Sequence, residues 1–176
     1  MQKYDPQETI KKYDTKIVRP QHRDEDVKLR GEGFDKKRLK EIKEGLITLH
    51  NLETMAANVY RFQITSKKSE LNRELIAAML NEMTHMQDFQ VKLFEYGWKP
   101  SIRMYFWYVV GIVFGTYSRL GGEKAIRKMG SWVEHKAVAH YQELLETIDW
   151  VEDTRKVNEK DWVDEFHHIE VWDKKH

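Results

Sequence analysis

The sequence predicts an all-α protein built as a bundle of long helices. Lys, Glu and Leu are abundant, whereas the 176 residues include only three prolines and nine glycines, and such a composition favours helices. Apolar residues also recur at helical spacing through four long segments, each with one stripe that can be buried. A further, shorter segment is apolar on nearly all sides, which sets it apart from the other four.

The size and composition fit one folded domain with a sizeable core. Apolar residues make up 40% of the chain, with six tryptophans, which is not the composition of a disordered protein. The net charge of +1 gives no argument for a nucleic-acid partner. The absence of cysteine excludes disulfides, zinc–thiolate sites and thiolate catalysis. We find no signal-peptide pattern and no apolar run of about 18 residues, so we expect neither a signal peptide nor a spanning helix.

The domain organisation follows from where the helical periodicity begins. Residues 1–37 are polar and mixed in charge, and we expect a surface arm there without visible chemistry. Residues 38–176 are expected to form the bundle. The sequence leaves two alternatives for residues 150–160, which either continue the preceding helix or form a turn. The other expected helices cover residues 38–65, 71–96, 101–120, 123–149 and a last segment that carries Trp172.

Residues 101–120 are apolar and aromatic on nearly all sides, with Gly111 and Gly115 four residues apart. The run is too short to cross a bilayer. Two interpretations are open: a helix buried in the core, or a helix lying on a membrane surface with aromatic rings at the interface and nearby Lys and Arg at anionic headgroups. If such a segment is exposed without a membrane, a homodimer would cover it.

Glutamate and histidine residues lie on the core-facing stripes of all four long helices. A carboxylate or an imidazole in a core is costly unless something satisfies it, and a metal ion does so. Residues at i and i+3 project from one face of a helix, so a Glu-x-x-His pair can offer two ligands to one site. In chain order the predicted metal ligands are Glu53, then Glu82 with His85, then Glu134, then Glu165 with His168.

This order of ligands is that of ferritin-like di-iron and di-manganese bundles: a Glu from each of two helices and Glu-x-x-His from each of the other two. Four carboxylates balance the charge of two divalent ions, and imidazoles complete each ion while positions stay open for dioxygen. The same donors serve iron and manganese, so the ligand set does not distinguish them. A single Glu-x-x-His arises readily by chance, so the prediction depends on the four stripes together.

Further polar residues lie near the predicted ligands. His140 and Tyr141 follow Glu134 by about two helical turns, and we expect them to orient carboxylates or relay protons. His50 and Tyr60 are weaker candidates for the same role. The alternative is that all four are polar core residues without a part in the chemistry.

From about residue 46 to residue 170, the sequence resembles the demethoxyubiquinone hydroxylases, which are di-iron monooxygenases of ubiquinone biosynthesis. The family has His-x-x-Glu-x-x-Ala in its first helix, Glu-x-x-His in its second, an Arg-Pro-Ser corner, Val-Glu…His-Tyr and Asp-Glu-x-x-His. Similar motifs stand in this chain, in the same order, at residues 50–56, 82–85, 99–101, 133–141 and 164–168.

The resemblance implies a ferritin-like four-helix bundle with an additional apolar, membrane-associated helix. It also implies O2-dependent hydroxylation of the quinone ring of a polyprenyl substrate by two iron ions, with electrons from a reduced nicotinamide or a quinol. Residues 102–117 would meet the membrane and admit the lipid tail, so the protein would be peripheral, on the cytoplasmic side.

Two alternatives to the hydroxylase stay open at this stage. One is a di-metal oxidase or peroxidase similar to rubrerythrin or ferritin, which uses the same ligands without quinone hydroxylation. The other is a structural bundle without metal, in which the glutamates pair with Lys or Arg.

Overall fold

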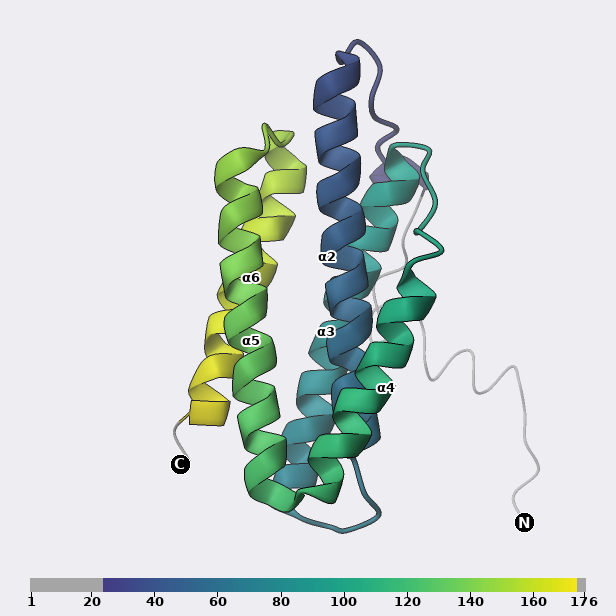
Figure 1. Cartoon of the computed structure of the whole chain (residues 1–176). Helices are drawn as coiled ribbons and strands as arrows, with labels where there is room; N and C mark the ends of the chain where they lie inside the picture. Colours follow the sequence, from purple (N-terminus) through teal and green to yellow (C-terminus); the bar gives the residue numbers. More distant parts are fainter. Residues whose placement is uncertain (1–23, 174–176) are drawn as a thin grey trace, which may run out of the picture.

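The computed structural model describes residues 24–173 (Figure 1). Most of the predicted N-terminal arm, residues 1–23, therefore lies outside the described range. The all-α prediction is confirmed for the part that is described. Its elements are the 3-10 turn η1 (Asp24–Asp26) and the helices α2 (Lys36–Gln63), α3 (Glu70–Glu95), α4 (Met104–Leu120), α5 (Gly122–Thr147) and α6 (Glu152–Asp173).

Two antiparallel hairpins form the four-helix bundle (Figure 1). Helices α2 and α3 make the first hairpin, and α5 and α6 make the second. Helix α4 is the additional helix, as predicted: it lies along the outside of α2 and carries the chain from one end of the bundle to the other, where α5 begins (Figure 1). This crossover lets the two hairpins lie side by side with their inward stripes facing.

Local sequence sets several helix ends. Asp35 caps α2, because its Oδ1 accepts hydrogen bonds from the backbone N–H groups of Lys37 and Arg38 at 2.9 and 3.0 Å. Ser69 caps α3, and its Oγ accepts a hydrogen bond from the N–H of Asn72 at 3.2 Å. Beyond the end of α3, Gly97 takes a positive φ of 72°, the left-handed conformation that commonly stops a helix.

Residues 150–160 neither extend α5 nor form a long turn. The chain turns between Thr147 and Glu152, and α6 then runs without a break. Apolar periodicity could not find this start, because the inward positions of the first half of α6 are polar. Thr154, Asn158 and Asp161 are all completely buried.

Two of the three apolar core clusters among the described residues form layers separated along the bundle. The layer nearest the start of α2 is built from Ile42, Leu46, Leu49, Phe89, Leu93, Tyr96, Tyr141, Leu145 and Trp150. The layer at the other end is built from Tyr60, Leu75, Ala78, Ile126 and Trp172. On α2, Glu53 lies between Leu49 of the first layer and Tyr60 of the second, so a polar layer is enclosed between two apolar ones.

Arg30 ties the described end of the arm to the bundle. Its backbone N–H donates to the Glu95 carbonyl at 2.8 Å, its Nε donates to Glu95 Oε2 at 2.6 Å, and its Nη2 pairs with Asp153. Burial by itself raises the pKa of Glu95, but the hydrogen bonds from Arg30 and Lys92 outweigh burial and hold that pKa below its ordinary value. The arm thus fastens the end of α3 to the start of α6.

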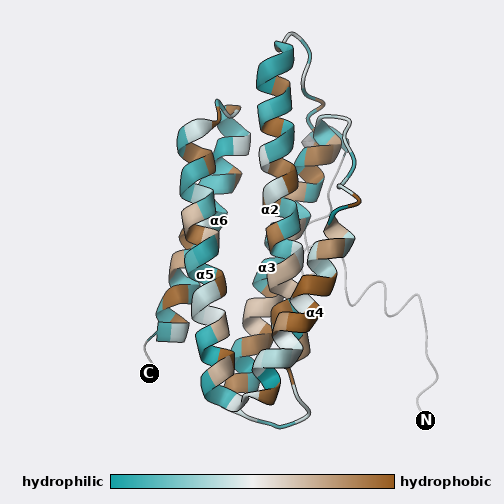
Figure 2. Ribbon diagram, viewed as in Figure 1, coloured by the Kyte–Doolittle hydropathy of each residue, from teal (hydrophilic) through white to brown (hydrophobic). Residues whose placement is uncertain are grey.

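Helix α4 is largely exposed, so the interpretation as a fully buried core helix is wrong. Figure 2 shows it as a strongly hydrophobic helix on the outside of the bundle. None of the helices within residues 24–173 combines the length and apolar composition needed to cross a membrane. The buried residues of α4 are only Gly111, Gly115 and Ser118. Its exposed apolar side chains are Tyr105, Phe106, Tyr108, Val109, Val113, Tyr117 and Leu120.

The two glycines let α4 approach the backbone of α2 closely. A Cβ atom on Gly111 would lie 2.5 Å from the Met55 carbonyl oxygen, and one on Gly115 would lie 2.5 Å from the Val59 carbonyl oxygen. A clash with backbone is not relieved by turning a side chain. The part of α4 that meets the α2 backbone is therefore made of small residues. Trp107, Val110 and Phe114 flank it and are partly buried against the core.

We expect Gly115→Ala to lower the free energy of unfolding by on the order of 1–2 kcal/mol. Overpacking costs about 1–3 kcal/mol, and the higher helix propensity of alanine offsets less than about 1 kcal/mol of it. Urea denaturation followed by circular dichroism measures the change. The control is Thr116→Ala at the exposed neighbouring position, expected to stay within about 0.5 kcal/mol of wild type. Equal stability of the two variants would contradict close packing of α4 on α2.

Candidate metal centre

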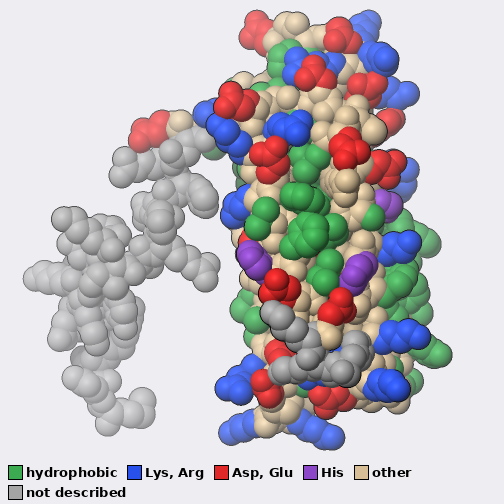
Figure 3. Space-filling model, turned by 90° about the vertical axis from the view of Figure 1, so that its left-hand side faces the viewer, with side chains coloured by type: hydrophobic (Ala, Val, Ile, Leu, Met, Phe, Trp, Pro, Cys, Tyr) green, Lys and Arg blue, Asp and Glu red, His purple; other side chains and the backbone are tan. Residues whose placement is uncertain are grey.

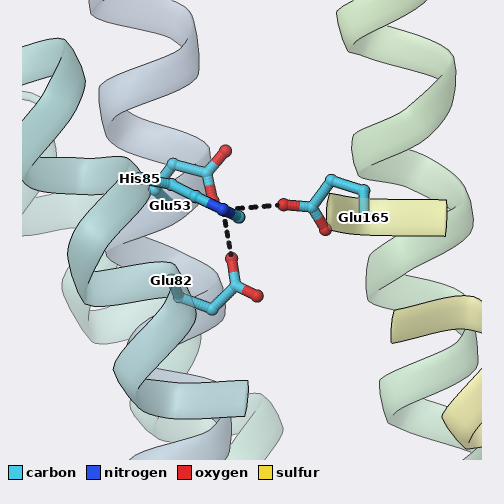
Figure 4. Close-up of side chains that lie close together, drawn as sticks. All are labelled: Glu53, Glu82, His85 and Glu165. Atoms are coloured by element: carbon cyan, nitrogen blue, oxygen red, sulfur yellow. Dashed lines mark ion pairs between the residues drawn. The ribbon is translucent and has the colours of Figure 1, made fainter. Parts of the chain in front are cut away.

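Six ionisable side chains meet in the polar layer between the two apolar layers, and none is more than 7% exposed. All four bundle helices contribute. Figure 4 shows Glu165 pointing from α6 across the bundle towards side chains of α2 and α3. The six are Glu53 from α2, Glu82 and His85 from α3, Glu134 from α5, and Glu165 and His168 from α6.

Glu82 and Glu165 lie at the centre, and each faces both histidines. Glu82 has Oε2 at 3.8 Å from His85 Nδ1 and Oε1 at 3.1 Å from His168 Nδ1. Glu165 has Oε1 at 3.0 Å from His85 Nδ1 and Oε2 at 3.7 Å from His168 Nδ1. A carboxylate that presents one oxygen to each of two positions is arranged as a bridging ligand.

The other two carboxylates each face one histidine. Glu53 Oε2 lies 3.9 Å from His85 Nδ1, and Glu134 Oε1 lies 3.6 Å from His168 Nδ1. The six residues thus divide into two groups of four potential ligands, with the donor atoms of each group within 4.8 Å of one another. Both groups contain Glu82 and Glu165, which is the arrangement of two adjacent metal positions that share two bridges.

The hydrogen bonding shows that these residues fit a pair of metal ions. Among the atoms that face the centre, seven are buried without a hydrogen-bond partner, and each such atom costs on the order of 1–3 kcal/mol in a dry core. Carboxylate oxygen and imidazole nitrogen are donors that suit iron and manganese. The seven are both oxygens of Glu82 and of Glu165, Oε2 of Glu134, and Nδ1 of His85 and of His168.

In the protein alone, protons balance the charge of the cluster. Burial and the nearby carboxylates raise the pKa values of Glu53 and Glu134 well above the ordinary value. Burial opposes charge on the His85 imidazole, but Glu165 and Glu82 outweigh it and raise the pKa to about 12. The pKa of Glu82 is lowered despite burial, because both histidines face it. A metal ion must therefore displace protons as it binds.

A tyrosine from the opposite hairpin holds each outer carboxylate. The Tyr141 hydroxyl of α5 donates to Glu53 Oε1 at 2.6 Å, and the Tyr60 hydroxyl of α2 donates to Glu134 Oε1. Burial and the neighbouring carboxylates raise the pKa of both tyrosines well above the ordinary value. Both hydroxyls therefore stay protonated and act as donors that orient the carboxylates.

The outward nitrogens of the two histidines also have partners. Nε2 of His85 lies 3.5 Å from Asp164 Oδ2, and Nε2 of His168 lies 2.8 Å from the side-chain amide of Asn81. Each partner stands directly before the Glu of the opposite Glu-x-x-His pair. Such contacts fix which ring nitrogen faces the centre.

Asp161 lies beside this arrangement and is completely buried. Burial raises its pKa to about 7. A carboxylate oxygen of Asp161, a carboxylate oxygen of Asp164 and a ring nitrogen of His85 could each bind a metal ion. These three atoms lie within 4.8 Å of one another. Sequence reasoning missed Asp161 and Asn81. Asn81 could have been found from its position: it directly precedes Glu82, as Asp164 directly precedes Glu165.

The six residues predicted as metal ligands lie in one cluster; that they bind metal stays a prediction. Tyr141 contacts Glu53, whereas the expected role for His140 finds no support in the geometry. The His140 side chain is 46% exposed, and its ion pair, at 3.9 Å, is with Glu143. The reason is helical phase: seven residues from Glu134 return to nearly the same face, whereas six residues fall about 120° away.

Comparison with known proteins agrees with this arrangement. The family model described as "Ubiquinone biosynthesis protein COQ7" matches residues 42–175, which include all six cluster residues. The chain belongs to the COQ7 family. The fold is accordingly the ferritin-like bundle of that family, and the buried carboxylate and histidine cluster is consistent with a di-iron site.

The curated proteins that match this chain have low sequence identity to it. The proteins named 3-demethoxyubiquinol 3-hydroxylase from Legionella pneumophila strains Lens and Corby are each 27% identical to this chain over 97 residues. These alignments cover 54% of this chain and 46% of each relative. The chain thus spans about half the length of the curated relatives it matches.

We expect Glu82→Ala to lose the ability to hold a metal pair, because Glu82 faces both positions. Metal analysis after anaerobic Fe²⁺ loading and gel filtration measures this, with two ions per chain expected in wild type and fewer than one in the variant. Circular dichroism checks that the helices persist. Glu146→Ala, at an exposed site on α5, should load like wild type. Full loading of Glu82→Ala would contradict a bridging role.

Proposed function

We propose that this protein is a di-iron, O2-dependent hydroxylase of the quinone ring of a lipid-tailed, demethoxyubiquinone-like substrate. The observation that carries the proposal is that Glu82 and Glu165 each face both histidines. Membership of the COQ7 family and the names of the curated relatives support the reaction and the substrate class.

Hydroxylation replaces a ring C–H bond by C–OH and reduces the second oxygen atom of O2 to water. Two electrons and two protons are needed, and a reduced nicotinamide or a quinol would supply the electrons. A bound iron pair would supply O2 activation. Glu53, Glu82, His85 and Glu165 would hold one ion, and Glu82, Glu134, Glu165 and His168 the other. This use of iron rather than manganese is part of the proposal.

The protein contributes orientation and the exclusion of water. Tyr141 and Tyr60 hold Glu53 and Glu134 by hydrogen bonds, so the outer ligands are oriented before any ion binds. The apolar layers at both ends close the site to bulk water, and a low dielectric strengthens each electrostatic contact inside.

An apolar surface groove, next to a buried apolar cluster that adjoins Glu134, supports a lipid-tailed substrate. A groove of about 390 Å³ between α4 and α5 is lined mainly by apolar side chains, including Phe114, Met129 and Trp132. Phe114 and Met129 also pack on a buried apolar layer that contains Val133, the neighbour of Glu134. The groove would hold the isoprenoid tail with the ring directed towards the metals.

The exposed face of α4 supports contact with a membrane surface. Tyr105, Phe106 and Tyr117 are 63%, 63% and 74% exposed, and basic residues near both ends of α4 would meet anionic headgroups. Placement on the cytoplasmic side stays part of the proposal.

Hydroxylation is tested by incubating the iron-loaded protein with reductant, O2 and a short-tailed demethoxyquinone. We expect mass analysis to find a product heavier by one oxygen atom, labelled when ¹⁸O2 is used. Glu165→Ala should reduce product at least about a hundredfold, because it removes a bridge. Turnover of peroxide without a quinone product would reject the hydroxylase and support the oxidase or peroxidase alternative.

Membrane contact is tested by co-sedimentation with vesicles that contain anionic lipid. We expect the double change Phe106→Asp, Tyr117→Asp to reduce binding about tenfold or more, because burying a charge in the interface opposes insertion. Phe94→Asp, at a 49% exposed site on α3, is the control and should bind like wild type. Equal binding by all three proteins would contradict contact through α4. Sedimentation velocity of the protein without vesicles shows whether it forms a homodimer that covers this face instead.

A further inference from the structure

The two halves of the cluster are nearly equivalent except for one charge. Behind His85, the partner of Nε2 is the Asp164 carboxylate, whereas behind His168 it is the Asn81 amide. Both partners occupy the same place in their motif, directly before a central Glu. The His85 side therefore faces a negative group where the His168 side faces a neutral one.

Asp161 adds a second carboxylate on the His85 side. It precedes Asp164 by three residues on α6, its side chain is 0% exposed, and neither of its oxygens has a hydrogen-bond partner. Lys160 Nζ lies 3.8 Å from Asp161 Oδ1 and 3.5 Å from Asp88 Oδ2. The carboxylates of Asp161 and Asp88 thus share one ammonium group. A buried carboxylate left without hydrogen bonds is costly, and a cation beside it removes that cost.

These residues make a continuous line from solvent to the cluster. The Asp164 side chain is 43% exposed, Asp161 is buried behind the surface, and His85 follows. The two nitrogens of the His85 ring face opposite ways: Nε2 towards Asp164 at 3.5 Å and Nδ1 towards Glu165 at 3.0 Å. The His85 ring thus contacts Asp164 on one side and Glu165 on the other.

A small hollow also leads to His168, but its chemistry differs. It has a volume of about 160 Å³ and is lined by Asn81, Glu74 and apolar residues. Glu74 pairs with Arg127 at 3.0 Å, so a cation there would meet an amide and a carboxylate that already has a partner. Negative potential, which concentrates cations at an opening, is therefore stronger on the His85 side.

We propose that Asp161 and Asp164 form a loading site for a divalent transition-metal ion, from which ions pass His85 into the di-metal centre. The proposal rests on the proposed di-metal centre. Two carboxylates and an imidazole nitrogen are a donor set suited to Fe²⁺, Mn²⁺ and Co²⁺. When Nδ1 of His85 binds metal, Nε2 carries a proton, so the loading site holds an ion only in transit.

The rate of Co²⁺ binding tests the loading site, since Co²⁺ in an oxygen and nitrogen site absorbs visible light. Stopped-flow mixing measures the rate, and equilibrium titration measures stoichiometry and affinity. We expect Asp161→Asn and Asp164→Asn each to slow binding about tenfold or more and to weaken its dependence on ionic strength. Both variants should still reach two ions per chain.

The matched control is Asp173→Asn. Asp173 is the same residue type on the same helix, with a side chain 44% exposed against 43% for Asp164, and its loss should leave the binding rate unchanged. Asp164 is half-exposed, so its variant tests the site even if Asp161→Asn fails to fold.

The remaining outcomes each overturn the proposal. Normal binding rates in both variants would reject the loading site while leaving the di-metal centre intact. Faster release of Co²⁺ with a normal binding rate would also reject it, and would leave the aspartates only the role of orienting His85. Failure of wild type to bind two ions would reject the di-metal centre together with its loading site.

Discussion

The structure depends on placing four carboxylates and two imidazoles inside a helical core. Each of these groups is costly to bury alone, and the bundle makes their burial tolerable by bringing opposite charges together and by enclosing them between apolar layers. Glu82 and Glu165 are central because each faces both histidines. The tyrosines and the outward partners of the histidines follow from the need to hold and neutralise this cluster.

The cost of burying these six groups also explains why the cluster could be predicted from the sequence. A carboxylate on an apolar stripe is rare enough to be informative when it recurs on four helices, and the helical phase then places all six side chains in one layer. Both ends of α3 were predictable because Ser69 and Gly97 act locally, through side-chain capping and a positive φ.

What the sequence did not predict depends on contacts between distant segments. The start of α6 was hidden because Asn158 and Asp161 face inward in place of apolar residues. Arg30 carries no local sign that it will pair with Glu95, 65 residues away. His140 was misjudged because adjacent positions on a helix point in different directions, and nearness in sequence to Tyr141 does not bring it to the cluster.

Both faces of α4 are apolar, but small residues line the strip where it contacts the α2 backbone. Gly111 and Gly115 bring it against α2, and large apolar side chains then remain outside. The opposite side of the molecule is different: Figure 3 shows hydrophobic side chains in the middle of the face on the side of α5 and α6, with charged side chains around them towards both ends. If α4 meets a membrane as proposed, one lipid-facing side would give the protein a fixed orientation for taking a substrate from the bilayer.

Each hairpin provides a Glu, a Glu-x-x-His pair, a tyrosine for the other hairpin's outer carboxylate and a side chain for the other hairpin's histidine. Two identical hairpins related by a twofold axis would supply the same set, so the chain is arranged like a symmetric dimer joined end to end through α4. Covalent joining has a consequence that a symmetric dimer lacks: the two halves can diverge. Asp164 and Asn81 are such a divergence, and they give the two proposed metal positions different surroundings.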